Sequence, residues 1–220
     1  MPRGWKLVKA GDFINFNPLE SIPKGTIAKK VAMEQLQPFT RDILGYEIVP
    51  FNGGSKFRNG DTLMARITPC LENGKTAQVN ILDKGEVGFG STEFIVLREK
   101  PNISDKDFIY YLAISPLLRD KAIKSMVGSS GRQRVQQGVL NDTEFYAPPI
   151  AEQLEIGQTL RTLDEKIAIN TQINHHLPER SATDSSPDIR RGKRVSRRAA
   201  RRVDSSRLTR ICSKKEAVTA

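Results

Sequence analysis

Two glycines, two serines and two arginines lie close together in the segment 128–134, which reads Gly-Ser-Ser-Gly-Arg-Gln-Arg. Glycines allow sharp turns, and backbone N–H groups and serine hydroxyls are suited to phosphate oxygens. Arginine matches the hydrogen-bonding edge of guanine, and glutamine that of adenine. This composition predicts a loop that contacts double-stranded DNA, and the alternative is a surface loop without a ligand. The candidate contacts are Ser129, Ser130, Arg132, Gln133, Arg134 and Gln136.

A second set of candidate DNA contacts lies in an earlier strand and turn: Arg66, Thr68, Asn73 and Lys75. Their side chains are suited to base edges and phosphates. Asn73-Gly74 is typical of a tight turn, here between strands expected over 62–67 and 75–81. The alternative for Arg66 is a partly buried salt bridge on its strand.

Motifs for catalysis or cofactor binding are incomplete. Gly74-Lys75-Thr76 ends like a phosphate-binding P-loop, but Pro69 stands where the motif requires its first glycine. His175 and His176 are adjacent and therefore do not form an i, i+4 metal-binding pair. We expect no catalytic site, no metal site and no cofactor in this chain.

The positive charge is concentrated at the C-terminal end. Residues 178–220 hold 13 Lys and Arg against 5 Asp and Glu, whereas the preceding residues hold 22 against 20. DNA binding by the main body must therefore rest on local patches. The Arg- and Ser-rich tail predicts disorder. Two widely separated cysteines and the lack of a membrane-length apolar run favour a cytoplasmic protein without a membrane segment.

Residues 1–149 are expected to form one α+β domain with a mixed or antiparallel sheet and short helices. The segment 5–16 predicts a short strand and a turn, and β-branched or alternating segments predict strands at 46–50, 62–67, 75–81, 93–98 and 139–146. A capping box of Ser104 and Asp107 predicts one helix. Pro116 predicts the start of another helix, and Gly128 its end. Residues 17–40 are expected to be irregular.

Residues 150–177 predict a long helix with a short heptad pattern. The seam consists of Ile156, Leu160, Leu163, Ile167, Asn170 and Asn174. Such a pattern calls for a partner helix, and buried asparagines would fix its register. The alternative is that both asparagines are solvated.

Five motifs in a fixed order resemble the specificity subunit of type I restriction–modification systems. They are residues 60–69 with 72–75, residues 90–98, the 128–135 loop, Pro148–Gln153, and Leu163–Ile167 with Asn170. The resemblance that these motifs indicate covers residues 5 to 177.

This resemblance implies a target recognition domain that reads one half of a split DNA sequence. It also implies that the spacer helix at 150–177 pairs antiparallel with another such helix. In that family the specificity subunit is non-catalytic and holds modification and restriction subunits. S-adenosylmethionine, ATP and Mg²⁺ are then expected on those partner subunits, where adenine is methylated and DNA is cleaved.

The chain departs from the family in two respects. Family members usually contain two recognition domains, and one is present here, which is expected of a half-subunit that forms a homodimer or of a truncated copy. An Arg- and Ser-rich stretch replaces the usual continuation of the helix, and an out-of-frame origin would explain it. Two competing hypotheses are a defective fragment that only binds partner subunits and a general nucleic-acid binder acting through residues 178–220.

Overall fold

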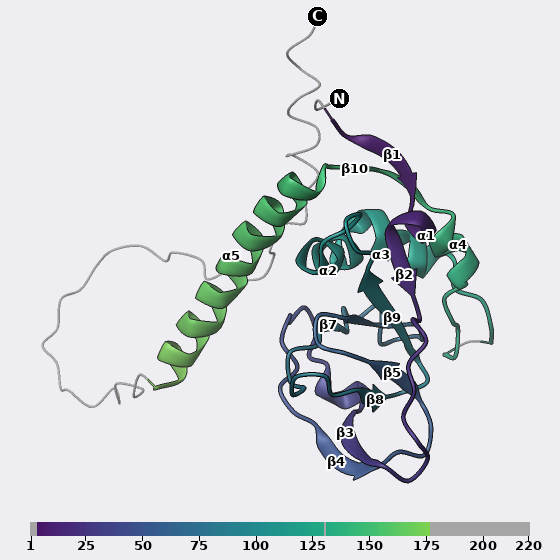
Figure 1. Cartoon of the computed structure of the whole chain (residues 1–220), viewed down its shortest axis with the longest axis vertical. Helices are drawn as coiled ribbons and strands as arrows, with labels where there is room; N and C mark the ends of the chain where they lie inside the picture. The colour runs from purple at the N-terminus through teal and green to yellow at the C-terminus, as the bar shows by residue number, and fades with distance from the viewer. Residues whose placement is uncertain (1–3, 130, 177–220) are drawn as a thin grey trace, which may run out of the picture.

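The computed structural model describes residues 4–129 and 131–176, and it confirms the expected α+β class (Figure 1). The strands are β1 (Lys6–Lys9), β2 (Ile14–Phe16), β3 (Ile27–Val31), β4 (Glu47–Pro50), β5 (Ser55–Phe57), β6 (Thr62–Ala65), β7 (Thr76–Gln78), β8 (Gly88–Gly90), β9 (Phe94–Glu99) and β10 (Glu144–Ala147). The helices are α1 (Ala10–Phe13), the 3₁₀ turn η1 (Met33–Gln35), α2 (Lys106–Ile114), α3 (Pro116–Lys124), α4 (Gln137–Asn141) and α5 (Ile150–His176). The predicted disordered tail, 178–220, lies outside the described residues.

The central sheet has the order β2-β9-β6-β7 and is antiparallel. Its two middle strands are buried on both faces. Met64 and Ile95 pack with the helices, whereas Leu63 and Val96 belong to a second apolar cluster on the opposite face. Because both faces are covered, β6 and β9 read as nearly continuous apolar runs.

The second four-stranded sheet, of order β4-β3-β8-β5, forms the end of the domain far from the helices α2, α3 and α4 (Figure 1). The expectation of irregular structure over 17–40 is wrong for β3, which pairs with β4 and β8. Lysines at 29 and 30 obscure its apolar pattern. The Lys29 ammonium lies 2.8 Å from Asp83 and 2.9 Å from Glu86. These carboxylates are more than 50 residues away in sequence, so only the folded chain pairs the charge of Lys29.

Helix α2 begins one residue later than the predicted capping box requires. Asp105, not Ser104, is the N-cap, and its carboxylate accepts hydrogen bonds from the N–H groups of Asp107 and Phe108. An aspartate caps a helix as well as a serine does. The Ser104 hydroxyl instead accepts a hydrogen bond from the N–H of Lys100 at 2.8 Å.

The expected end of α3 at Gly128 is also wrong. The helix ends at Lys124, with Ser125 as its C-cap, because the chain then turns into a hairpin in which Val127 pairs with Arg134.

The strand expected over 139–146 is only partly correct. Leu140 is fully buried in the core from helix α4, and the strand β10 begins at Glu144. β10 pairs antiparallel with β1, so the two ends of the domain lie side by side next to the start of α5 (Figure 1). The boundary that we predict at 149 falls one residue before the helix.

Candidate nucleic-acid interface

An isolated antiparallel bridge between Val127 and Arg134 closes a hairpin whose described residues are 127–129 and 131–134. Val127 and Arg134 exchange two backbone hydrogen bonds of 3.1 and 2.9 Å. Gly128 has a φ of +135°, and a Cβ at this position would lie 2.9 Å from the carbonyl oxygen of Arg132. Only glycine fits such a conformation and such an approach without strain. The two sides of the predicted loop are therefore held together next to Gly128.

The tip of the hairpin is polar and open to solvent. Ser129 and Arg132 are exposed, and the N–H of Arg132 donates to the carbonyl of Ser129 at 3.0 Å. Within 4–129 and 131–176, no carboxylate pairs with the Arg132 guanidinium. Gln133 is half-buried, and Ser130 lies outside the described residues. Arg132 is thus a cation that a phosphate or a base could bind directly.

The base of the hairpin packs on the segment that follows β6. The N–H of Thr68 donates to the carbonyl of Gln133 at 3.0 Å, and the N–H of Gln133 donates to the Thr68 hydroxyl at 3.0 Å. The N–H of Val135 donates to the carbonyl of Arg66 at 2.8 Å. The structure therefore joins parts of the two predicted clusters, 65 residues apart in sequence.

Arg134 is held in a bidentate ion pair with Glu93. Its Nε lies 3.0 Å from both carboxylate oxygens, and its Nη2 lies 2.7 Å from Oε1. The hydrogen bond from Arg134 lowers the pKa of Glu93, and the same contact raises the pKa of Arg134. The pair occupies one edge of a half-exposed guanidinium and leaves Nη1 for another acceptor. Glu93 lies at the start of the strand predicted over 93–98, and no local signal marks it as the partner of Arg134.

Arg66 lies beneath the hairpin rather than at its tip. The side chain is half-buried, and its Nη2 donates to the carbonyl of Val135 at 3.3 Å. Among the residues that the structure describes, its buried Nε has no hydrogen-bond partner and no carboxylate forms a salt bridge with it. The salt-bridge alternative is therefore not what the structure shows, and Arg66 supports the hairpin from below.

Asn73 and Lys75 lie on another side of the same connection. The tight turn predicted at Asn73-Gly74 is instead the end of a ten-residue link, 66–75, between β6 and β7. The Lys75 ammonium donates to the carbonyl of Met33 at 2.9 Å, whereas Asn73 is exposed. A Cβ on Gly74 would collide with the ring of Phe39 at 2.6 Å. Lys75 therefore holds this turn in place, and Asn73 remains a surface residue.

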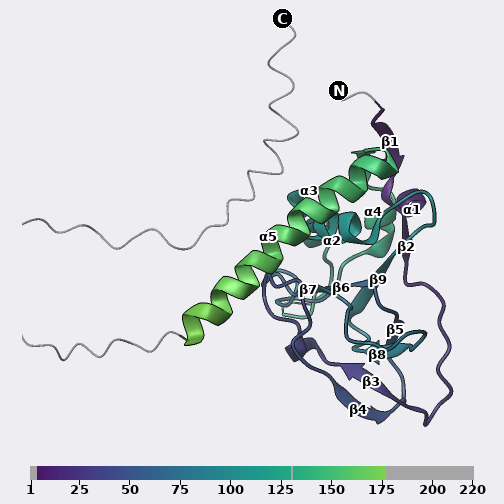
Figure 2. The same ribbon diagram turned by 60° about the vertical axis from the view of Figure 1, so that its left-hand side comes forward.

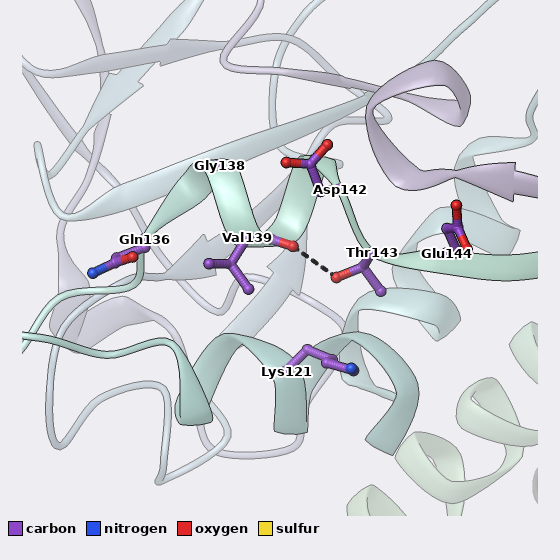
Figure 3. Close-up of a pocket in the computed structure, with 7 residues that line it drawn as sticks. All are labelled: Lys121, Gln136, Gly138, Val139, Asp142, Thr143 and Glu144. Atoms are coloured by element: carbon purple, nitrogen blue, oxygen red, sulfur yellow. Dashed lines mark hydrogen bonds between the residues drawn. The ribbon is translucent and has the colours of Figure 1, made fainter.

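Gln136 follows the hairpin and lines a shallow hollow between α3 and α4 (Figure 3). Lys121 reaches into it from α3, and Asp142 and Glu144 lie on the opposite wall. The Thr143 hydroxyl donates to the carbonyl of Val139 at 2.8 Å and so has its partner. The hollow carries charges of both signs, and it forms a polar border to the hairpin rather than a site for one charged ligand.

The predicted seam of α5 is half-buried at its start and exposed further along the helix. Ile156 and Leu160 are half-buried, whereas Leu163 is 50% exposed and Ile167 is 57% exposed. The remaining seam residues, Asn170 and Asn174, are exposed in the single chain, which agrees with the alternative that both asparagines are solvated. The side of the helix around Gly157, next to Ile156 and Leu160, packs on α2. The exposed part of the seam therefore begins at Leu163.

The described part of the chain has neither a membrane-spanning helix nor a cluster of metal-ligating side chains. None of its helices is both long and apolar enough to cross a membrane. In the same residues, no group of three or more His, Cys, Asp or Glu side chains could hold a metal ion. The expectation that the chain carries no cofactor stays a prediction.

Known proteins resemble this chain in sequence and in fold. The Escherichia coli protein "Type I restriction enzyme EcoAI specificity subunit" is 35% identical over 104 residues, which is 47% of this chain and 18% of that protein. The Escherichia coli "Type I restriction enzyme EcoEI specificity subunit" is 29% identical over 168 residues, 74% of this chain and 28% of that protein. The chain thus spans less than a third of either relative.

A crystal structure of the HsdS subunit from Thermoanaerobacter tengcongensis shares the fold, with a TM-score of 0.64 and 19% identity over 80% of this chain and 46% of that one. The family model described as "Type I restriction modification DNA specificity domain" matches residues 2–179. This match covers the hairpin, the sheets that support it and all of α5. The chain therefore belongs to the family of type I restriction–modification DNA specificity domains.

Proposed function

We propose that this chain reads one half of a two-part sequence in duplex DNA, as a non-catalytic specificity component of a type I restriction–modification complex. The observation that carries the proposal is the hairpin at 127–134: Arg132 at its tip is exposed and has no carboxylate partner within the described part of the chain, and a buried sheet lies beneath it. Family membership supports it, as does the name "specificity subunit" that its relatives bear.

The hairpin has side chains suited to reading the major groove. The major groove of B-DNA is about 12 Å wide and admits protein elements such as a two-stranded β-ribbon. The guanidinium of Arg132, which has no carboxylate partner among the described residues, can contact a guanine edge or a phosphate. Arg134 is oriented by Glu93 and offers its remaining N–H groups. The hydroxyl of Ser129 is suited to the DNA backbone.

Helix α5 supplies the second part of the proposal. Its 27 residues form a rod of about 40 Å. The exposed seam at Leu163 and Ile167 pairs with the seam of another such helix, from a second copy of this chain or from another half-subunit. Two recognition domains are then held apart, so that each reads one half of the target.

Partner subunits carry out the catalytic reactions of the complex. Modification subunits methylate adenine with S-adenosylmethionine, and restriction subunits use ATP and Mg²⁺ to cleave. The decisive experiment is to map methylated sites with this chain as the sole specificity component beside the modification subunits. We expect one two-part sequence, and methylation without sequence preference would refute the proposal.

A second candidate function is a scaffold fragment that binds partner subunits through α5 but reads no DNA. The observation that favours it is the separation of the exposed seam from the hairpin, on a different element of the molecule. Co-purification with modification subunits in the absence of any methylation would support the scaffold. Deleting residues 178–220 tests the third hypothesis, because a tail-driven binder loses its DNA affinity whereas a hairpin-driven reader keeps its sequence preference.

A further inference from the structure

One buried amide connects the recognition domain to the spacer helix. Gln153, in the first turn of α5, is 1% exposed. Its Nε2 donates to the carbonyls of Ile103 and Pro148 at 3.0 and 2.9 Å, and its Oε1 accepts from the N–H of Asp105 at 2.9 Å. One side chain therefore joins the segment before α2 to the start of α5 by three hydrogen bonds.

The next turn of α5 brings the two helices into direct contact. A Cβ on Gly157 would lie 3.0 Å from the Asp105 carboxylate and 3.0 Å from the Cβ of Asp107. Real side chains rarely tolerate such distances, so glycine allows the closest approach of α5 to the N-terminus of α2. In Figure 2 the helix α5 passes directly across α2.

A third contact lies two turns further along α5. The Tyr111 hydroxyl donates to the carboxylate of Asp164 at 2.7 Å. Arg161 lies 3.8 Å from Asp107, whose other oxygen accepts from Arg41 at 2.8 Å. The contacts at 153, 157 and 164 therefore fix α5 along about 16 Å of its length.

We propose that Gln153, Gly157 and the Tyr111–Asp164 hydrogen bond lock the angle between the recognition domain and α5, and that this lock decides which spacing between two half-sites is accepted. The inference rests on the proposed function, because a spacing exists only for a two-part target. These are positioning residues, since none of them lies on the hairpin.

A small change of angle has a large effect at the far end of the rod. About 35 Å of helix separates Gln153 from His176. A tilt of about 10° would displace that end by about 6 Å, nearly two base-pair steps of 3.4 Å. A helix held by one contact could absorb such a tilt, whereas three contacts along its length resist it.

The lock is tested first on the full chain without DNA. Spin labels at Thr92→Cys, on the recognition domain, and at Gln172→Cys, on α5, report their distance distribution in a background of Cys70→Ala and Cys212→Ala. We expect a narrow distribution that Tyr111→Phe broadens. The matched controls are Asp164→Asn, which keeps an oxygen that accepts from Tyr111, and Gln158→Ala, which removes an exposed glutamine of the same helix. An unchanged distribution in Tyr111→Phe and Gln153→Ala would overturn the inference.

The second test measures methylation of duplexes with fixed half-sites and a spacing varied by single base pairs. The full chain with its modification subunits should prefer one spacing by at least about tenfold. Tyr111→Phe should reduce this preference to about threefold or less, with the half-site sequences unchanged, and Asp164→Asn should keep it. An unaltered spacing preference in Tyr111→Phe and Gln153→Ala would contradict the inference. A wild-type chain without any two-part target would instead refute the proposed function and remove the role of the lock.

Discussion

Arg132 offers the sharpest test of the hairpin as a DNA reader. The structure separates it from Arg134, because Arg132 is exposed without a carboxylate partner among the described residues, whereas Arg134 is bound by Glu93 through two N–H groups. Arg132→Ala removes a side chain that supports nothing in the fold. We therefore expect a loss of DNA affinity without a loss of stability.

The size of the effect depends on what Arg132 contacts. A bidentate contact to guanine is worth about 1–3 kcal/mol, so the affinity for the specific site should fall by about 5- to 150-fold while non-specific binding changes little. A phosphate contact should weaken all sequences alike and reduce the salt slope of log K by about 0.9. Arg134→Ala should also weaken binding, because it leaves the Glu93 carboxylate unneutralised beside the DNA.

Fluorescence anisotropy with specific and scrambled duplexes at several salt concentrations distinguishes these outcomes. Lys166→Ala is the charge-matched control, since this exposed lysine lies on α5, away from the hairpin. Thermal unfolding confirms that each variant is folded. Equal affinities and equal salt slopes for wild type and Arg132→Ala would refute the assignment of the hairpin tip to DNA.

Three further predictions concern the helix and the ion pair. Leu163→Glu should leave the single chain folded, because this side chain is half-exposed there. It should weaken self-association by more than about 100-fold, since association would bury the new charge in the seam. An unchanged sedimentation coefficient would count against the seam. Gln153→Ala should lower the free energy of unfolding by about 3 kcal/mol, which is about 1 kcal/mol for each lost hydrogen bond. The control Gln158→Ala should lower it by less than about 0.5 kcal/mol. Urea unfolding measures both values, and equal losses would contradict the role of the buried amide. The hydrogen bond from Arg134 lowers the pKa of Glu93 in the folded state. The stability advantage of wild type over Glu93→Gln should therefore be complete above pH 4.5 and disappear as the pH falls through the lower folded-state pKa. A difference in the free energy of unfolding that stays constant with pH would argue against this ion pair.

The long helix and the buried strands were predictable because their signals are local. Residues 150–176 carry a helical pattern that begins after Pro149 and needs no partner to be recognised. β6 and β9 are predictable as apolar and β-branched runs. The strand β3 was not, because its lysines become compatible with a sheet only when Asp83 and Glu86 approach from a distant turn.

The candidate site likewise has features that the local sequence predicts and features that depend on distant residues. The glycines and arginines of the 128–134 segment indicate a turn with DNA-binding chemistry from sequence alone. The sequence cannot distinguish Arg132 from Arg134, because the difference lies in a carboxylate 41 residues away from Arg134. The sequence likewise cannot show that the Lys75 ammonium donates a hydrogen bond to the carbonyl of Met33.

What the sequence determined by itself was the family, the α+β class, the long helix and the segment whose residues can contact DNA, because these depend on composition and on short-range periodicity. Tertiary structure alone decided which arginine is free, which face of α5 packs on the domain and which amide joins them. Those outcomes depend on contacts such as that of Gln153 with Asp105, which form between residues 48 positions apart only when the chain is folded.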